Sequence, residues 1–314
     1  MTYTIVLDDA DVLSRVCGTN DSNLQLIEAH LGVSVFTRGN ELSIETADES
    51  KRREFRRVID RIIGECTEGV VCDAELVSAA LADGRSSTFD AAGCTISVPG
   101  AFRKVFPRTK NQARLVSAFR RSSLVFATGP AGSGKTFLAV AEALRLLLQR
   151  TVGRLVLTRP IVEAGESLGF LPGALEDKIN PYLRPLYDAM YAILPREVVH
   201  KLAERGSIET APLAYMRGRT MSDCAVILDE AQNTTREQMK LFLTRMGESA
   251  RMFVTGDLTQ VDLPRRVPSG LAHALRVLRN VPEISVVELT CADVVRSALV
   301  KKIVQAYEDE QDDE

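Results

Sequence analysis

The sequence predicts an α/β protein in which a small α+β domain precedes a larger domain with a mainly parallel sheet. Three observations predict this fold class. From about residue 99 onward, short apolar runs alternate with helical patterns; a glycine-rich loop joins one such run to a helix; and the first 66 residues follow the order βααββα. Alternating strands and helices are typical of a parallel sheet that helices cover on both faces.

The glycine-rich loop spans residues 129–136, GPAGSGKT, and matches G-x-x-x-x-G-K-[ST]. The apolar run 124–128 precedes it as a candidate strand, and apolar residues follow at helical spacing from Phe137. In such a loop, backbone N–H groups surround a polyphosphate at the positive end of the helix dipole. We therefore predict that a nucleoside triphosphate binds Gly129, Pro130, Ala131, Gly132, Ser133, Gly134, Lys135 and Thr136, with Lys135 also catalytic and Thr136 a ligand of Mg²⁺.

Two acids follow the apolar run Ala225–Leu228, a second candidate strand. Asp229 is placed to hold Mg²⁺, usually through water, and Glu230 to activate the attacking water. Positioning and charge neutralisation carry most of phosphoryl transfer, so these two roles suffice for a hydrolase. The alternative, a helix cap, is weaker because Thr234 and Glu237 are expected to form a capping box for the next helix.

A third candidate strand, Met252–Thr255, ends in Gly256 and Asp257. In sheets of this type, ligands sit beyond the carboxyl ends of the strands. Gln260 is therefore predicted to sense the γ-phosphate, and Asp257 to support the metal site. The remaining candidate strands are 155–158 and 285–289.

The first 66 residues have the element order of a KH-like module, which grips single-stranded nucleic acid with a G-x-x-G loop. That loop here reads Gly18-Thr19-Asn20-Asp21, without the second glycine, so an RNA clamp and a protein-binding scaffold remain equally open. The third helix has an apolar face and, around it, Lys51, Arg52, Arg53, Arg56, Arg57 and Arg61. The expected elements are strands at 3–7, 33–37 and 41–45, and helices at 11–17, 22–31 and 50–66.

Charged residues are distributed unevenly along the chain. Residues 1–98 carry 9 Lys/Arg and 17 Asp/Glu, whereas residues 99–307 carry 30 and 19, and the tail 308–314 has six acids. A basic surface favours a polyanionic partner, and an ordinary solvated surface explains the charge equally well. We predict a small domain at 1–66, a linker at 67–98, a catalytic domain at 99–307 and an acidic tail at 308–314.

The composition favours a soluble chain with substantial cores, since 45% of the residues are hydrophobic and 26% charged. No run approaches the length of a membrane span, and the N-terminus lacks a basic region ahead of an apolar stretch. We expect a cytoplasmic protein without a membrane partner. The six cysteines form no C-x-x-C pair, which predicts reduced, mostly buried thiols.

An ordered set of motifs closely resembles the PhoH-like ATPases over roughly residues 100–307, and the N-terminal segment looks like the small domain of the longer family members. The resemblance implies a RecA-like P-loop domain similar to the first such domain of superfamily 1 helicases. It also implies ATP and Mg²⁺ as ligands, ATP hydrolysis, and a link to RNA metabolism with an endoribonuclease or the ribosome as partner. The motifs are GPAGSGKT (129–136), LTRP (157–160), GESLGFLPG (165–173), PYLRPLYDA (181–189), APLAYMRGRT (211–220), ILDEAQN (227–233), QMKLFLTRMG (238–247), VTGDLTQVDLP (254–264) and DVVR (293–296).

The same resemblance assigns three further residues. Gln112 matches a glutamine that reads adenine, Arg159 matches a segment that contacts nucleic acid, and Arg296 matches a late arginine of the family pattern. Relatives often continue DVVRH, whereas this chain has Ser297, so no role of that histidine transfers.

About fifty residues follow Gln260, too few for a second RecA-like domain of ordinary size. Hydrolysis at useful rates generally needs an arginine finger, so a neighbouring subunit is expected to supply it in a homo-oligomer, a hexameric ring by resemblance. The candidates are Arg296, ranked first by resemblance, and Arg217, Arg219 and Arg245.

Two alternatives stay open. Tyr182, Tyr187 and Tyr191, in the long insertion 163–195, suit packing or a subunit interface better than base stacking. The predicted function is ATP hydrolysis coupled to RNA binding or remodelling, with helicase activity as one form of it. The alternative is a nucleotide-gated binding protein that uses slow hydrolysis as a timer, and RNA-stimulated turnover separates the two.

Overall fold

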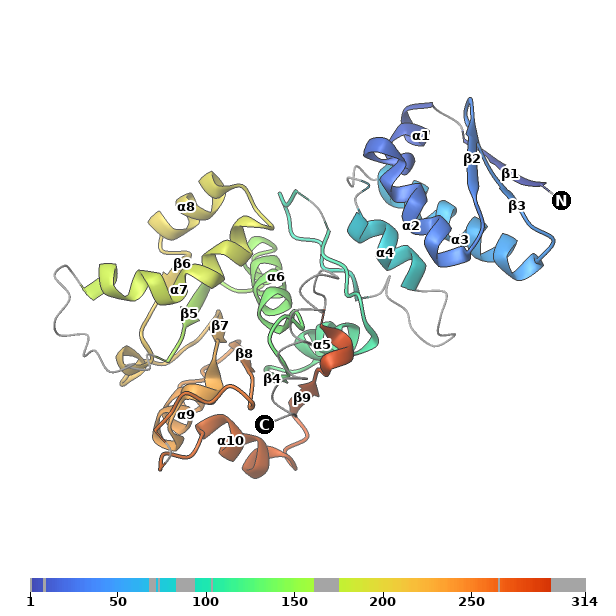
Figure 1. The fold of residues 1–314 in the computed structure, drawn as a ribbon. Helices are drawn as coiled ribbons and strands as arrows, with labels where there is room; N and C mark the ends of the chain where they lie inside the picture. Colours follow the sequence, from blue (N-terminus) through green and yellow to red (C-terminus); the bar gives the residue numbers. More distant parts are fainter. Residues whose placement is uncertain are drawn as a thin grey trace. The chain divides into compact units, whose positions relative to one another are not determined.

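The computed structural model describes residues 2–7, 10–67, 72, 74–82, 94–102, 104–160, 175–264 and 266–294. The chain forms two compact units, Met1–Ala113 and Arg114–Glu314 (Figure 1). Phe106 belongs to the hydrophobic core of the first unit. The domain boundaries given above remain a prediction.

The first unit has the predicted element order. Its three strands form an antiparallel sheet in the order β1-β3-β2, in which Tyr3 pairs with Ile44 and Ile5 with Leu42. This order agrees with the sequence pattern, whereas the KH likeness remains a prediction. The elements are β1 (Thr2–Val6), α1 (Ala10–Cys17), the 3₁₀ turn η1 (Thr19–Asp21), α2 (Ser22–Leu31), β2 (Val35–Arg38), β3 (Glu41–Glu45), α3 (Glu49–Thr67) and α4 (Ala74–Ala82).

Helix α3 is the main apolar support of that unit. Phe55, Val58, Ile59 and Ile62 recur at helical spacing and are fully buried, in one core with strand β3 and helices α1, α2 and α4. The arginines of α3 lie outside this apolar stripe, which leaves a basic face on the helix.

The second unit is built on a six-stranded sheet with the order β6-β5-β7-β8-β4-β9, and all its strand pairs are parallel. This confirms the predicted α/β class and parallel sheet. The elements are α5 (Lys110–Arg121), which begins in the first unit, β4 (Leu124–Thr128), α6 (Lys135–Leu148), β5 (Arg154–Thr158), α7 (Leu175–Tyr191), α8 (Arg196–Glu204), β6 (Ile208–Thr210), η4 (Leu213–Met216), β7 (Cys224–Leu228), η5 (Ala231–Asn233), α9 (Arg236–Leu243), β8 (Arg251–Gly256), α10 (Gly270–Leu278), β9 (Ile284–Glu288) and η6 (Cys291–Asp293).

Both faces of this sheet are covered, as a parallel sheet requires. On one face, Val226 and Leu228 of β7 share a core with Met239 and Phe242 of α9, and α10 completes this layer. On the other face, α6 packs across β5, β7 and β8 (Figure 1). The ring of Phe119 from α5 lies 4.4 Å from that of Phe253 of β8. All residues of β4 and β7 are buried, which explains their uninterrupted apolar runs.

Strand β8 lies between β4 and β7 in the sheet. The carboxyl ends of these three strands are therefore neighbours, and the segments that follow them meet at one edge. The sequence patterns did not predict β6, which has three residues and is too short for a recognisable alternation.

Two smaller findings concern the thiols and membrane spans. All six cysteines are free: Cys17, Cys66 and Cys224 are buried, Cys72 and Cys94 are half-buried, and Cys291 is exposed.

In the portions of the chain with assigned positions, no helix has the length and apolar character needed to cross a membrane.

The predicted capping box was wrong by one residue. Thr235, rather than Thr234, is the N-cap of α9; its hydroxyl accepts from the N–H of Gln238, whose side chain accepts from the N–H of Thr235. Thr234 is buried, and its hydroxyl donates to the carbonyl of Ala231 at 2.7 Å. The T-x-x-E spacing alone does not distinguish two adjacent threonines.

We predict that Thr235→Ala lowers the free energy of unfolding by about 1 kcal/mol, because two backbone N–H groups lose their partners or their geometry. Arg236→Ala, an exposed change in the first turn of the same helix, is the control and should change it by less than about 0.5 kcal/mol. Urea denaturation of the three proteins measures both. Equal losses in the two variants would contradict the assigned cap.

Candidate nucleotide-binding site

The phosphate loop between β4 and α6 needs glycine for two reasons. Gly129, Gly132 and Gly134 have φ of 143°, 79° and 85°, a region that other residues rarely adopt. A Cβ on Gly129 would lie 2.4 Å from the carbonyl oxygen of Leu289, just after β9. The loop thus packs directly on neighbouring backbone, and α6 begins with Lys135 at its end.

Lys135 lies inside this loop. Its side chain is buried, and Nζ donates to the carbonyl of Pro130 at 3.2 Å. Burial lowers the pKa of Lys135, while the carboxylates of Asp257, Asp229 and Glu230 act in the opposite direction. Phosphate oxygens in the loop would supply the negative partner that a buried ammonium requires.

Thr136 and Asp229, the two predicted metal ligands, are in direct contact, and their role as ligands stays a prediction. The Thr136 hydroxyl donates to Oδ1 of Asp229 at 2.8 Å, and the Thr255 hydroxyl donates to the same oxygen at 2.6 Å. The backbone N–H of Asp229 donates to the carbonyl of Thr158 at 3.0 Å, which fixes the carboxylate at the end of β7. A hydroxyl and a carboxylate are the hard oxygen donors that Mg²⁺ prefers, so this donor set fits the ion carried by a nucleotide.

Glu230 follows directly in an unusual backbone conformation. Its φ is 53°, in the left-handed region, where a residue other than glycine costs of order 1 kcal/mol or more. Its Oε1 lies 2.8 Å from Nη2 of Arg159, and its Oε2 accepts from Gln232 at 2.6 Å. Both carboxylate oxygens are therefore engaged by side chains of the protein.

Gln232 is a site residue that the sequence reasoning missed. It is fully buried in η5; Nε2 donates to Glu230 and to the carbonyl of Gln260 at 3.1 Å, and Oε1 accepts from the N–H of Asp257 at 3.0 Å. One amide thus joins the segments that follow β7 and β8. Its position two residues after Glu230 was the available signal, but its other two partners, Asp257 and Gln260, lie 25 and 28 residues away in the chain.

Asp257 and Gln260 lie at this edge of the sheet. Oδ2 of Asp257 accepts from the N–H of Ala131 at 3.1 Å, and Oδ1 accepts from the N–H and hydroxyl of Thr259. Asp257 therefore braces the phosphate loop. Gln260 has an exposed side chain and a backbone held by Asp257 and Gln232, and its role as γ-phosphate sensor stays a prediction.

Two residues assigned by resemblance are not joined to this site by the described contacts. Gln112 is buried in the first unit, where its Oε1 accepts from the N–H of Arg108 at 2.7 Å. Arg296 lies outside the described residues. The adenine-reading and finger roles of these residues remain predictions.

The other arginine-finger candidates differ in how they are held. Both terminal nitrogens of Arg219 donate to the carboxylate of Glu209, at 2.5 and 2.9 Å, and this contact lowers the pKa of Glu209. Arg245 donates to the carbonyl of Arg219 at 3.4 Å, whereas Arg217 is exposed. Arg219 is therefore already paired with a carboxylate of its own chain.

Tyr191, the last residue of α7, contacts α8, and the side chain of Tyr182 lies outside the described part of the structure. The rings of Tyr187 and Tyr191 lie 6.1 Å apart, Tyr191 stacks on His200 at 6.0 Å, and Arg196 lies 5.1 Å from the Tyr191 ring. These contacts favour packing over base stacking for Tyr187 and Tyr191, as the sequence analysis preferred.

Comparison with known proteins agrees with this geometry. The sequence profile of the family described as PhoH-like protein matches residues 104–308. The chain is 46% identical over 302 residues to a PhoH-like protein of Mycobacterium bovis, covering 95% of this chain and 85% of that protein. It is 43% identical over 310 residues to a PhoH-like protein of Bacillus subtilis, covering 96% of each.

Among solved structures, the Sulfolobus solfataricus SWI2/SNF2 ATPase core in complex with dsDNA is similar over 46% of this chain and 31% of that chain. The sequence identity is 14% and the TM-score 0.31, too low to carry an argument about this chain. The profile match and the two relatives are decisive, and they show that the chain belongs to the PhoH-like protein family.

Proposed function

We propose that this protein hydrolyses ATP to ADP and phosphate and couples the hydrolysis to the binding or remodelling of RNA. The observation that carries the ATPase assignment is the 2.8 Å contact between the Thr136 hydroxyl and the Asp229 carboxylate, beside the buried Lys135. Two segments far apart in the sequence thus present an ammonium, a hydroxyl and a carboxylate at one edge of a parallel sheet. That set suits a magnesium–triphosphate complex.

In the proposed reaction, a Mg²⁺ ion carried by ATP would supply charge neutralisation at the phosphates. Lys135 and the loop N–H groups hold the phosphates, while Thr136 and Asp229 orient the ion. Glu230 accepts a proton from the attacking water as the water oxygen bonds to the γ-phosphorus and the bond to the β-phosphate oxygen breaks. The products are ADP and inorganic phosphate.

Coupling to RNA is supported by the ion pair between Glu230 and Arg159. A carboxylate whose oxygen is held by a guanidinium at 2.8 Å is not free to turn toward an attacking water. A phosphodiester binds a guanidinium through bidentate hydrogen bonds and therefore competes with Glu230 for Arg159. RNA at Arg159 would release Glu230 and raise the rate of hydrolysis.

The oligomeric state, partners and location are part of this proposal. A homo-oligomer, a hexameric ring by resemblance, would supply the arginine finger in trans, with Arg296 the first candidate. The link to an endoribonuclease or the ribosome and the cytoplasmic location rest on the family resemblance and on composition.

A second candidate function is a nucleotide-gated binding protein in which slow hydrolysis acts as a timer. The engagement of both Glu230 carboxylate oxygens by Arg159 and Gln232 favours slow turnover in the absence of an activator. RNA-stimulated ATPase activity is required by the first function and not by the second.

We predict that Glu230→Gln lowers ATP turnover by about 100-fold or more while ATP binding persists, because the amide cannot accept the water proton. ATPase rates with and without single-stranded RNA, together with ATP titration calorimetry, measure this. Glu237→Gln, an exposed change nearby, is the control and should leave the rate unchanged. Unchanged turnover in Glu230→Gln would remove Glu230 from the mechanism.

We predict that Arg159→Ala raises the basal ATPase rate severalfold and abolishes stimulation by single-stranded RNA. The reason is that Glu230 loses the cation that restrains it and RNA loses its contact. Arg154→Ala, at the start of the same strand β5, is the matched control and should keep both the basal rate and the stimulation. A variant of Arg159 that retains full stimulation would exclude the proposed competition.

A further inference from the structure

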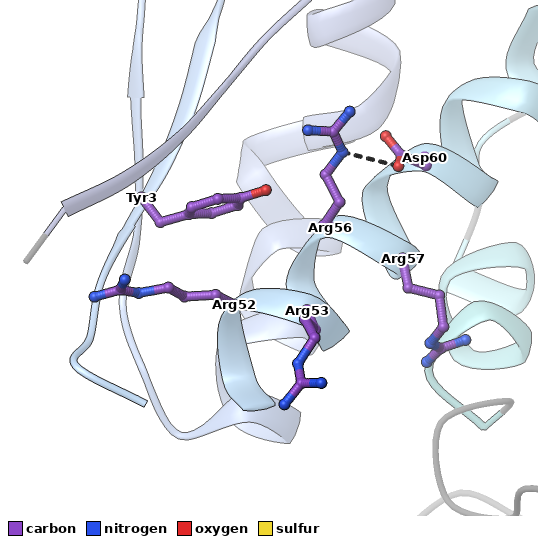
Figure 2. Close-up of a pocket in the computed structure, with 6 residues that line it drawn as sticks. All are labelled: Tyr3, Arg52, Arg53, Arg56, Arg57 and Asp60. Atoms are coloured by element: carbon purple, nitrogen blue, oxygen red, sulfur yellow. Dashed lines mark hydrogen bonds and ion pairs between the residues drawn. The ribbon is translucent and has the colours of Figure 1, made fainter. Parts of the chain in front are cut away.

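A groove in the first unit carries four arginines. Figure 2 shows Arg52 and Arg56 of α3 beside Tyr3 of β1, whereas the side chains of Arg53 and Arg57 point away from Tyr3. These five residues and Asp60 line a cavity of about 470 Å³. We call this the α3 groove. It is strongly basic, although residues 1–98 carry an excess of acidic residues.

Neutral carbonyls, rather than carboxylates, hold three of these guanidinium groups in place. Nε and Nη2 of Arg52 donate to the carbonyl of Thr46 at 3.0 and 2.5 Å. Nη1 of Arg57 donates to the carbonyl of Ala80 at 3.0 Å, and Nε of Arg53 donates weakly to that of Glu49 at 3.4 Å. A carbonyl fixes the position of a guanidinium without cancelling its charge, so these groups remain able to bind an anion.

The acids near the groove do not neutralise it. Asp60, the one carboxylate in the lining, pairs with Arg56 at 2.9 Å, and both side chains are more than half exposed. A pair so exposed contributes little free energy and yields readily to a competing anion. Tyr3 and Asp60 raise the pKa of Arg56, which keeps it charged. Glu54 of the same helix contacts His30 at 3.1 Å.

One guanidinium nitrogen of Arg57 lacks a hydrogen-bond acceptor among the described residues. Its Nη2 is buried and has no hydrogen-bond partner within the described portion of the chain. A buried donor without an acceptor costs free energy.

We propose that the α3 groove binds the sugar–phosphate backbone of single-stranded RNA, and this inference rests on the proposed RNA-coupled function. Arginine forks match phosphate oxygens. Arg52 and Arg56 lie one helical turn apart, about 6 Å along the axis, comparable to the separation of successive phosphates on one strand. Tyr3 at the rim offers a ring on which a base can stack.

The groove also explains how the first unit can bind RNA without an intact G-x-x-G loop. The turn from Gly18 to Asp21 contains a carboxylate and no basic residue, and its second glycine position is Asp21, with φ of 55°. This turn is therefore a poor grip for phosphate. The basic contact of this unit lies on α3 instead.

The test uses the full chain and a fluorescently labelled 20-nucleotide poly-uridine RNA in anisotropy titrations over a range of salt. The variant is Arg53→Glu with Arg56→Glu, because both side chains are exposed and neither supports the core. We expect RNA affinity to fall at least about tenfold and the salt dependence to weaken by one to two ion equivalents. ATP affinity and the RNA-free ATPase rate should not change.

The matched control is Arg15→Glu with Arg38→Glu, which makes the same charge change at exposed positions of the same unit, on α1 and β2. It should retain RNA affinity within about twofold at physiological salt, where distant surface charges are screened. Equal losses in the two double variants, or no loss in the Arg53/Arg56 variant, would overturn the proposal. A further outcome would also overturn the proposal: poly-glutamate binds in a way that requires Arg53 and Arg56, while RNA does not bind. The groove would then be assigned to an acidic protein segment.

Failure of this proposal is separable from failure of the proposed function. If RNA stimulates the ATPase of the wild type and of the Arg53/Arg56 variant at equal RNA concentrations, the groove proposal fails and the RNA-coupled function stands. If RNA binds through Arg53 and Arg56 but does not stimulate hydrolysis, the groove stands and the coupling fails.

Discussion

The carboxylate of Asp229 is the contact on which the site depends. Its Oδ1 accepts hydrogen bonds from Thr136 at 2.8 Å and Thr255 at 2.6 Å, so one oxygen joins helix α6, the segment after β7 and the end of strand β8. This arrangement requires β8 to lie between the other two strands, as the sheet order provides. Because the parallel strands end together, helix α6 begins where the carboxylate lies, and a triphosphate can meet an ammonium, a helix N-terminus and a metal ligand at once.

A second layer of contacts makes the edge rigid. Gln232 forms hydrogen bonds with Glu230, Asp257 and Gln260. Asp257 in turn accepts a hydrogen bond from the N–H of Ala131 in the phosphate loop. The buried side chains of Gln232 and Asp257 thereby have hydrogen-bond partners, which buried polar groups require. The restraint of Glu230 by Arg159 and Gln232 connects this rigidity with the proposed regulation, since a firmly held carboxylate needs a competing ligand before it can serve as a base.

The two units suggest a division of roles in the proposed function. The second unit contains the phosphate loop and the residues proposed for hydrolysis, and Arg159 is the proposed point at which RNA influences Glu230. In the first unit, α3 buries its apolar stripe and presents arginines that are held by carbonyls. Both RNA proposals rely on the same physical property: a guanidinium that is positioned, still charged, and able to exchange its present partner for a phosphate.

The sequence by itself determined the parallel α/β class, most strands, the phosphate loop and the pair Asp229–Glu230, because these depend on local period and on motifs of fixed spacing. Only the tertiary structure decided the strand order, the bridging role of Gln232, the loop-bracing role of Asp257 and the choice of Thr235 over Thr234 as helix cap. Those features depend on contacts between segments far apart in the chain, or on the backbone angles at one residue. Spacing in a sequence constrains neither of these.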